Sequence, residues 1–284
     1  MTAPRPCLHV VPQLRWSREG DRSQPESDER LGPVLDDALR QLEEGRLPHL
    51  HLDGPLVLIE DWLAQAPAGE RDQRRARIAQ QVAAGRLAVG PWLVHTDPAL
   101  ASAELQEWNL RLGLELGDAL GGAPRVGDLR HTSGPTAGVP SLLRRFGIHT
   151  AVLQRGIPAH HSGSWLRWSA PDGAEVTALW LPPVPEADAA VRFLGAERAP
   201  LDAELGARLT QLGATADMRC GSLAAFLATA PEPTTLPELR GELRDPRRVG
   251  TWPRWSPGPV WGPGTPPRTP STPPPRRPGG PCSA

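Results

Sequence analysis

The chain contains no lysine and no tyrosine, and its 284 residues include only three phenylalanines, two methionines and three cysteines. Arg, Ala, Gly and Pro are abundant instead, a bias expected of a very GC-rich gene and carrying no functional meaning. The cysteines Cys7, Cys220 and Cys282 are odd in number and far apart. They predict neither a disulfide framework nor a zinc ribbon, so we expect a reducing, cytoplasmic compartment.

A charge excess of one sign and a long apolar run are also missing. The 31 basic and 32 acidic side chains give a net charge of -1. This balance argues against a protein that binds nucleic acid or a membrane surface through phosphate groups. No apolar run reaches the length of a transmembrane helix, and the N-terminus has no signal-peptide pattern. We therefore expect no nucleic-acid partner and no membrane partner.

Short apolar runs alternate with amphipathic segments from Cys7 to about residue 230. Strands are expected at 7–11, 49–54, 86–90, 125–129, 150–154 and 175–181. Helices are expected at 33–44, 55–65, 70–84, 99–120, 141–146 and 201–212. Strands that alternate with helices indicate an α/β domain built on a mostly parallel sheet.

The composition changes abruptly near Gly250. Residues 250–284 are rich in Pro and Gly and have no hydrophobic period, which predicts a disordered tail after a domain at residues 1–249. A proline-rich ligand for an aromatic-groove module is the alternative for this segment.

Several phrases occur in a fixed order over residues 8–248. They are HVVPQLRWSRE (9–19), HLDGPLVLIEDWL (51–63), AGRLAVGPWLVHTDPALASAE (84–104), NLRLG (109–113), LRRFGIHTAVLQRGIP (143–158), WSAPDGAEVTALWL (168–181) and LPELRGELR (236–244). Together they resemble the N-terminal catalytic domain of glycoside hydrolase family 38, the zinc-dependent α-mannosidases. The order and spacing make this constellation more specific than any single short motif.

The resemblance implies a fold and a chemistry. The fold would be a seven-stranded, mostly parallel, barrel-like sheet surrounded by helices, with the site at the carboxyl ends of the strands. The chemistry would be hydrolysis of terminal α-mannosides with retention of configuration, which needs a carboxylate nucleophile and a second carboxylate as acid and base. A zinc ion would hold hydroxyls of the sugar.

The chain departs from the family at the residues that carry this chemistry. Arg15 and Ser17 stand at two positions where the family has zinc ligands, and a guanidinium has no lone pair to give a metal. His131 stands at the position of the nucleophile, and Asp128, three residues earlier, is not an obvious replacement. We therefore expect this chain to bind no zinc.

The block that carries the acid/base carboxylate in the family is also shortened. Only Gly213–Cys220 separates the last predicted helix from the next family phrase, and Asp217 is the lone carboxylate there. After Arg244 the family phrases stop, which fits a frameshift near Val249 and a truncated chain.

Four further residues occupy positions that would face the sugar. Trp16 is either a stacking platform or a half-buried core aromatic, and Trp92 either lines the mouth of the site or packs. Asp97 would lie at the same mouth. Asp53 is a substrate contact or, as the Asp-Gly pair after a strand suggests, a loop or capping residue.

These observations predict a degenerate and truncated family-38-like domain with little or no mannosidase activity. The alternative is a non-catalytic protein that binds mannoside glycans or interacts with another protein through its tail. A third possibility is that errors in the sequence hide an ordinary active enzyme.

Overall fold

The computed structural model describes residues 7–16, 23–53, 55–158, 160–181, 191–197, 211, 213–214 and 217–244, and for residues 53, 192 and 194–197 it describes the backbone alone. The chain divides into units at Met1–Gly250 and Thr251–Ala284, and everything below concerns the first. Ser17, most of the predicted helix at 201–212 and the predicted tail at 250–284 lie outside the described residues.

The first sheet is built around the N-terminal strand. Its order is β3–β2–β1–β8, and β9 also pairs with β1. The strands are β1 (Cys7–Arg15), β2 (Leu50–Asp53), β3 (Leu87–Ala88), β8 (Val191–Glu197) and β9 (Asp217–Cys220). All these pairs are parallel. The carboxyl ends of the strands therefore lie at one edge of the sheet.

The second sheet has the order β10–β6–β7–β5–β4. Its strands are β4 (Val126–Leu129), β5 (Thr150–Leu153), β6 (Trp165–Ser169), β7 (Glu175–Trp180) and β10 (Glu238–Arg240). β6 and β7 form an antiparallel hairpin, and the other pairs are parallel. The α/β class and the mostly parallel pairing predicted from the sequence are thus confirmed.

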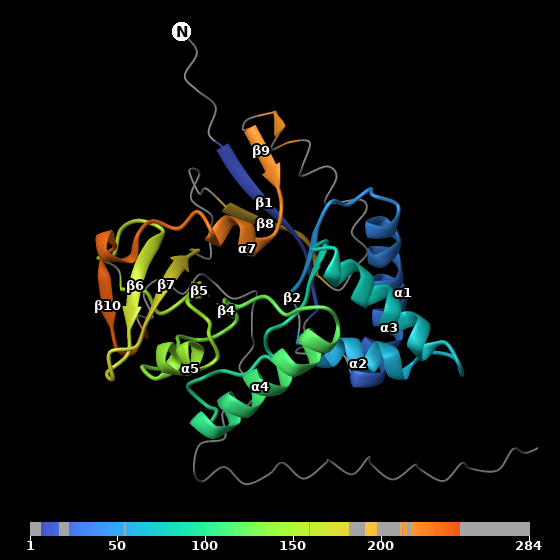
Figure 1. The fold of residues 1–284 in the computed structure, drawn as a ribbon, viewed down its shortest axis with the longest axis horizontal. Helices are drawn as coiled ribbons and strands as arrows, with labels where there is room; N and C mark the ends of the chain where they lie inside the picture. Colours follow the sequence, from blue (N-terminus) through green and yellow to red (C-terminus); the bar gives the residue numbers. More distant parts are fainter. Residues whose placement is uncertain are drawn as a thin grey trace, which may run out of the picture. The chain divides into compact units, whose positions relative to one another are not determined.

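Helices cover the outer faces of the two sheets (Figure 1). α1 (Gln24–Glu43), α2 (Val57–Ala64) and α3 (Arg71–Ala83) gather beside the first sheet. α4 (Ala103–Ala119) and α5 (Val139–Arg145) lie with the second, and α7 (Leu223–Leu227) and the 3₁₀ turn Pro233–Thr235 follow β9. No helix in the described part of the chain is both long and apolar enough to cross a bilayer.

Two predicted helix starts were wrong. α1 begins at Gln24 rather than at Pro33, which lies inside the helix. Pro is favoured in the first turn of a helix, but here Leu31 and Leu35 pack on both sides of it and hold the turn together. α4 begins after Ser102, whose hydroxyl accepts a hydrogen bond from the N–H of Leu105 at 3.2 Å, so the cap sets the start.

A small apolar cluster joins the two sheets. Val11 of β1 and Val191 of β8 pack with Val126, Val152 and Leu179 of the second sheet and with two leucines of α7. The inner faces of both sheets therefore share one interior. The expected single seven-stranded sheet is not confirmed, because hydrogen bonding among the described strands forms two five-stranded sheets.

Helix α4 lies directly against the segment that follows β3. A Cβ added at Gly113 would lie 2.1 Å from the carbonyl oxygen of Pro91 and 2.5 Å from the nitrogen of Leu93. The side chain of Asn109 fixes the same contact, because it accepts from the N–H of Val94 at 2.8 Å and donates to the carbonyl of Val94 at 2.9 Å.

This close approach makes Gly113→Ala a test of the packing. Because backbone atoms on both sides must move, we expect a loss of about 1–3 kcal/mol in the free energy of unfolding, measured by urea denaturation. Gly138→Ala is the matched control, since a Cβ there meets nothing within 4 Å. Equal stabilities of the two variants would contradict the packing.

His49 lies buried just before β2, with Nδ1 3.1 Å from the carbonyl oxygen of Gly85. Burial lowers the pKa of His49, and the hydrogen bond to Gly85 only partly offsets this. The unfolded chain therefore binds the proton more readily than the folded one.

The shift predicts how stability depends on pH. The contribution of His49 is fully present above its unfolded pKa of about 6.5 and is lost as the pH falls below that value. His49→Asn keeps a donor for Gly85 and should flatten the fall in unfolding free energy between pH 7 and pH 5. His160→Asn, at an exposed histidine, is the control and should leave the profile unchanged. A profile unchanged in His49→Asn would refute the prediction.

Candidate functional site

Polar side chains of β1, β2 and β4 meet inside the shared interior. Val11 and Val126 belong to the cluster between the sheets, so Gln13 and Asp128, each two residues further along its strand, point to the same interior. His51 is the register partner of Gln13 on β2. Because side chains alternate between the two faces of a strand, a carboxylate, an amide and an imidazole come together near the ends of three strands.

Arg130 ties this group together. Its Nε lies 2.9 Å from Oδ1 of Asp128 and its Nη2 lies 2.6 Å from Oδ2, a bidentate pair. Its Nη1 donates to Oε1 of Gln13 at 3.1 Å, which links β4 to β1. The guanidinium also lies 3.8 Å from the centre of the Phe193 ring. The Arg130 and Asp128 side chains are only 6% and 9% exposed, so this pair is an interior one.

The charge of Asp128 follows from these contacts. Burial alone would raise the pKa of this carboxyl, but the charge of Arg130 and the hydrogen bonds from His51 and Arg130 outweigh it and hold the pKa well below its usual range. His51 Nε2 lies 3.5 Å from Oδ2 of Asp128. Asp128 is therefore a carboxylate anion with its oxygens engaged by Arg130.

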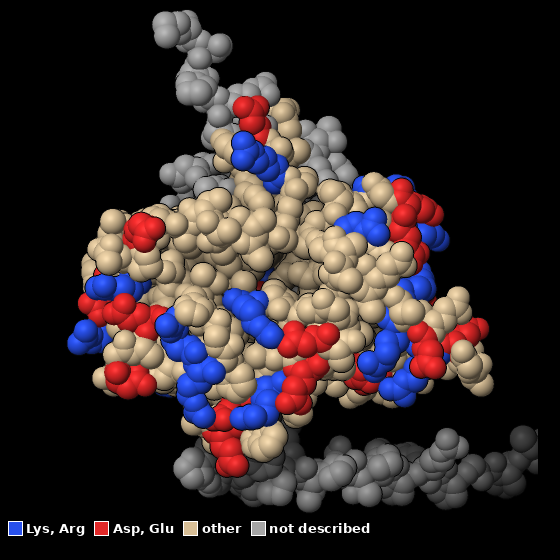
Figure 2. All heavy atoms as spheres, in the orientation of Figure 1, with Lys and Arg blue, Asp and Glu red and all other residues tan. Residues whose placement is uncertain are grey.

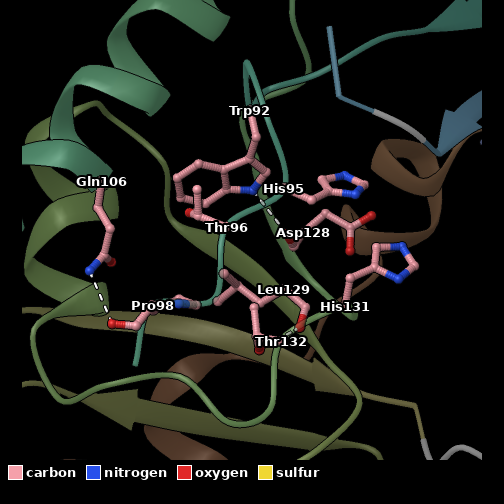
Figure 3. A pocket seen from close by; sticks show the side chains of 9 residues that line it. All are labelled: Trp92, His95, Thr96, Pro98, Gln106, Asp128, Leu129, His131 and Thr132. Atoms are coloured by element: carbon pink, nitrogen blue, oxygen red, sulfur yellow. Dashed lines mark hydrogen bonds between the residues drawn. The ribbon is translucent and has the colours of Figure 1, made fainter. Parts of the chain in front are cut away.

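A small cavity opens beside Asp128 (Figure 3). Its volume is about 20 Å³, and it is lined by Trp92, His95, Thr96, Pro98, Gln106, Asp128, Leu129, His131 and Thr132. A cavity of this size holds about one water molecule and is too small for a sugar ring. The His95 and His131 rings stack with their centres 4.9 Å apart. Figure 3 shows the Asp128 carboxylate beside these two rings.

Asp97 fixes the loop at the rim of this cavity. One carboxylate oxygen accepts hydrogen bonds from the hydroxyl and the N–H of Ser133, and the other accepts from the N–H of Ala99 at 3.0 Å. Gln106 holds the same loop by donating to the carbonyl of Pro98 at 3.2 Å. In this structure Asp97 joins the loop before α4 to the loop after β4.

The two tryptophans predicted to face the sugar are both buried. Trp16 is 1% exposed, lies in the cluster under α1 and donates from Nε1 to the hydroxyl of Ser27 at 3.2 Å. It has no ring face open to a ligand, which favours the packing alternative. Trp92 donates from Nε1 to the carbonyl of Asp128 at 2.9 Å and presents one side to the small cavity.

The remaining predicted residues lie at the ends of β1, β2 and β4. Arg15 and Asp53 are register partners on β1 and β2, and the structure describes only the backbone of Asp53. His131 lines the cavity, whereas Ser17 lies outside the described residues. Sequence reasoning missed Arg130 and His51, although the alternation along Gly127–Arg130 would have placed Arg130 on the same face as Asp128.

The described donors do not fit a zinc site. Zinc takes imidazole, thiolate or carboxylate ligands, and Arg15 offers none of these. Within the described ranges, no group of three His, Cys, Asp or Glu side chains could hold a metal ion. The nearby Asp128 carboxylate is already engaged by a guanidinium.

Two arginines and an aspartate near these strand ends influence one another electrostatically. Burial and the charge of Arg15 lower the pKa of Arg155, and the charge of Asp97 opposes them. Arg15, Arg155 and Asp97 therefore share one electrostatic neighbourhood.

Comparison with known proteins gives partial matches. No family profile matches the chain. A protein of Halalkalibacterium halodurans named "Putative mannosylglycerate hydrolase" is 28% identical over 187 residues, which cover 61% of this chain and 20% of that protein. The chain thus spans about a fifth of this relative.

Solved structures share the fold. An alpha-mannosidase from Enterococcus faecalis superposes with a TM-score of 0.69 and 20% identity, covering 84% of this chain and 31% of that one. A second Enterococcus faecalis protein, of glycosyl hydrolase family 38, gives a TM-score of 0.60 and 17% identity, covering 84% and 29%. The described part of the chain therefore has the fold of a glycoside hydrolase family 38 domain, as its sequence motifs predicted.

Proposed function

We propose that this chain is a glycoside hydrolase-like domain that does not hydrolyse α-mannosides by the zinc-assisted retaining mechanism. The observation that carries the proposal is the state of Asp128. This carboxylate lies inside the site, three residues before His131, and both of its oxygens are engaged by Arg130.

A retaining glycosidase needs two carboxylates with different duties. The nucleophile must be free to attack the anomeric carbon, and the acid/base group must carry a proton at working pH. Asp128 meets neither need, because Arg130 neutralises its charge and its lowered pKa keeps it from carrying a proton. Asp97, the other carboxylate at the cavity, accepts hydrogen bonds from Ser133 and Ala99.

The residue at the position of the family's nucleophile also lacks the chemistry of a retaining glycosidase. His131 lines the cavity, stacked on His95. An imidazole offers no carboxylate to form and release the glycosyl ester of a retaining mechanism. Arg15, at a ligand position of the family, adds a positive charge where a zinc ion would have to be held.

Mannoside glycans, the ligands that the relatives' names suggest, would be bound without turnover, and the chain would be cytoplasmic. The small cavity beside Asp128 has no room for a mannosyl ring in this structure.

Zinc titration combined with an activity assay tests the proposal. We expect no tight stoichiometric zinc binding by calorimetry. We also expect no release of mannose from an aryl α-mannoside or from mannosylglycerate, with zinc or with EDTA. Zinc-dependent turnover that EDTA abolishes would sink the proposal. Resequencing the gene from codon 1 past the stop codon is the companion control, because carboxylates at positions 17 and 131 would reveal a misread enzyme.

The Asp128–Arg130 pair also makes a prediction about stability. Arg130→Met leaves a buried carboxylate with His51 and the backbone N–H of residue 130 as its remaining partners. Breaking a buried pair in this way costs about 3–5 kcal/mol. The double variant Arg130→Met/Asp128→Asn removes the stranded charge and should recover a large part of that loss in urea denaturation. A double variant no more stable than the single one would show that the pair does not hold the interior as described.

A further inference from the structure

A second hollow lies on the outer side of helix α4, away from the buried strand ends. It has a volume of about 630 Å³, within the range of roughly 300–1,000 Å³ usual for ligand sites. The groove runs between the first half of α4 and the start of α5. Its lining includes the polar and aromatic side chains Glu104, Glu107, Trp108, Arg111, Ser141 and Arg145.

Trp108 lines this groove and differs in its exposure from most other tryptophans that the structure describes. Its side chain is 52% exposed, although most other tryptophans described in the chain are buried. The Arg111 guanidinium lies 5.6 Å from the centre of the indole and 5.7 Å from the centre of the Phe146 ring, within cation–π distance of both. About half of the Trp108 surface therefore faces solvent beside a guanidinium group.

Three of the four charged side chains that line the groove form ion pairs with one another. Glu107 accepts from Arg111 at 3.1 Å and from Arg145 at 3.0 Å and 3.1 Å. With Glu104, the lining contains two acidic and two basic groups, so their formal charges cancel. Figure 2 shows blue and red side chains intermixed over α4 and α5.

The balance of positive and negative charge in the groove favours an uncharged ligand. A groove without a net charge gives no long-range attraction to a phosphate, a nucleic acid or another strongly charged ligand. Fixed carboxylates and guanidinium groups beside an exposed aromatic ring suit a neutral molecule with many hydroxyls. A pyranose ring has such a rim of hydroxyls and a flat C–H face that can lie on an indole.

We propose that the groove between α4 and α5 binds a neutral saccharide, with one sugar ring stacked on Trp108. The hydroxyls of the sugar would form hydrogen bonds with Glu104, Glu107, Arg145 or Ser141. The site is distinct from the cavity beside Asp128, since Gln106 is the one lining residue that the two have in common among the described residues. Saccharide binding in this groove makes and breaks no covalent bond. The binding does not depend on whether the domain hydrolyses mannosides, so this proposal is independent of the proposed function.

The test measures whether mannobiose, maltose or cellobiose binds to the full chain. Saturation-transfer NMR and tryptophan fluorescence detect the binding. We expect at least one disaccharide to bind in the millimolar range. Trp108→Ala should weaken this binding about tenfold or more, and Trp108→Phe should retain part of it because an aromatic face remains.

Leu105→Ala is the matched control. Leu105 lies on the same helix and is 51% exposed, but it does not line the groove. Its replacement should leave saccharide binding unchanged. Absence of binding up to tens of millimolar, or equal losses in the Leu105 and Trp108 variants, would overturn the proposal. A dimer of the chain in sedimentation experiments that both the Leu105 and the Trp108 variants dissociate would also overturn the proposal. This face of α4 would then be a protein interface. Hydrolysis of a mannoside, in contrast, would refute the proposed function and leave this proposal standing.

Discussion

The bidentate pair between Arg130 and Asp128 determines the character of the interior between the two sheets. A carboxylate placed there by the alternation of β4 would be costly to desolvate without a partner. Arg130 supplies that partner from the same strand end and also reaches Gln13 on β1. The pair therefore stabilises the ends of two strands that belong to different sheets and fixes the charge state of the site.

The chemistry of the site follows from the same contact. A carboxylate engaged by a guanidinium is a weak nucleophile and a poor proton donor, and it has little left to offer a metal ion. The family fold is retained around this group, with the strand ends in place. The two sheets pack through apolar residues such as Val11 and Val126, and a shared fold does not by itself establish an activity.

Local patterns predicted much of the fold. The apolar spacing identified α2 to α5 and the strands near Val126, Thr150 and Glu175, and the motifs identified the family of the fold. The division into two sheets depends on pairing between distant segments, such as β1 with β8, which no local period reveals. The early start of α1 was missed because Pro33 looked like a first-turn residue.

The site was less predictable than the fold. Comparison with family positions singled out Arg15, His131 and Trp16, but position alone does not tell whether a side chain is open to a ligand. The burial of Trp16 depends on the packing of α1, and the hydrogen bonds of Asp97 depend on the loop after β4. Arg130 was overlooked because it has no counterpart among the family's functional residues, although its neighbour Asp128 was noticed.

Covalent trapping is the most direct test of the claim that the site lacks a glycosidase nucleophile. An activated fluoro-mannosyl fluoride forms a long-lived ester with the carboxylate nucleophile of a retaining glycosidase. After incubation of the full chain with this reagent and zinc, intact-mass spectrometry should show the unmodified mass. A stoichiometric glycosyl adduct that maps to Asp128, or to any other carboxylate, would contradict the account.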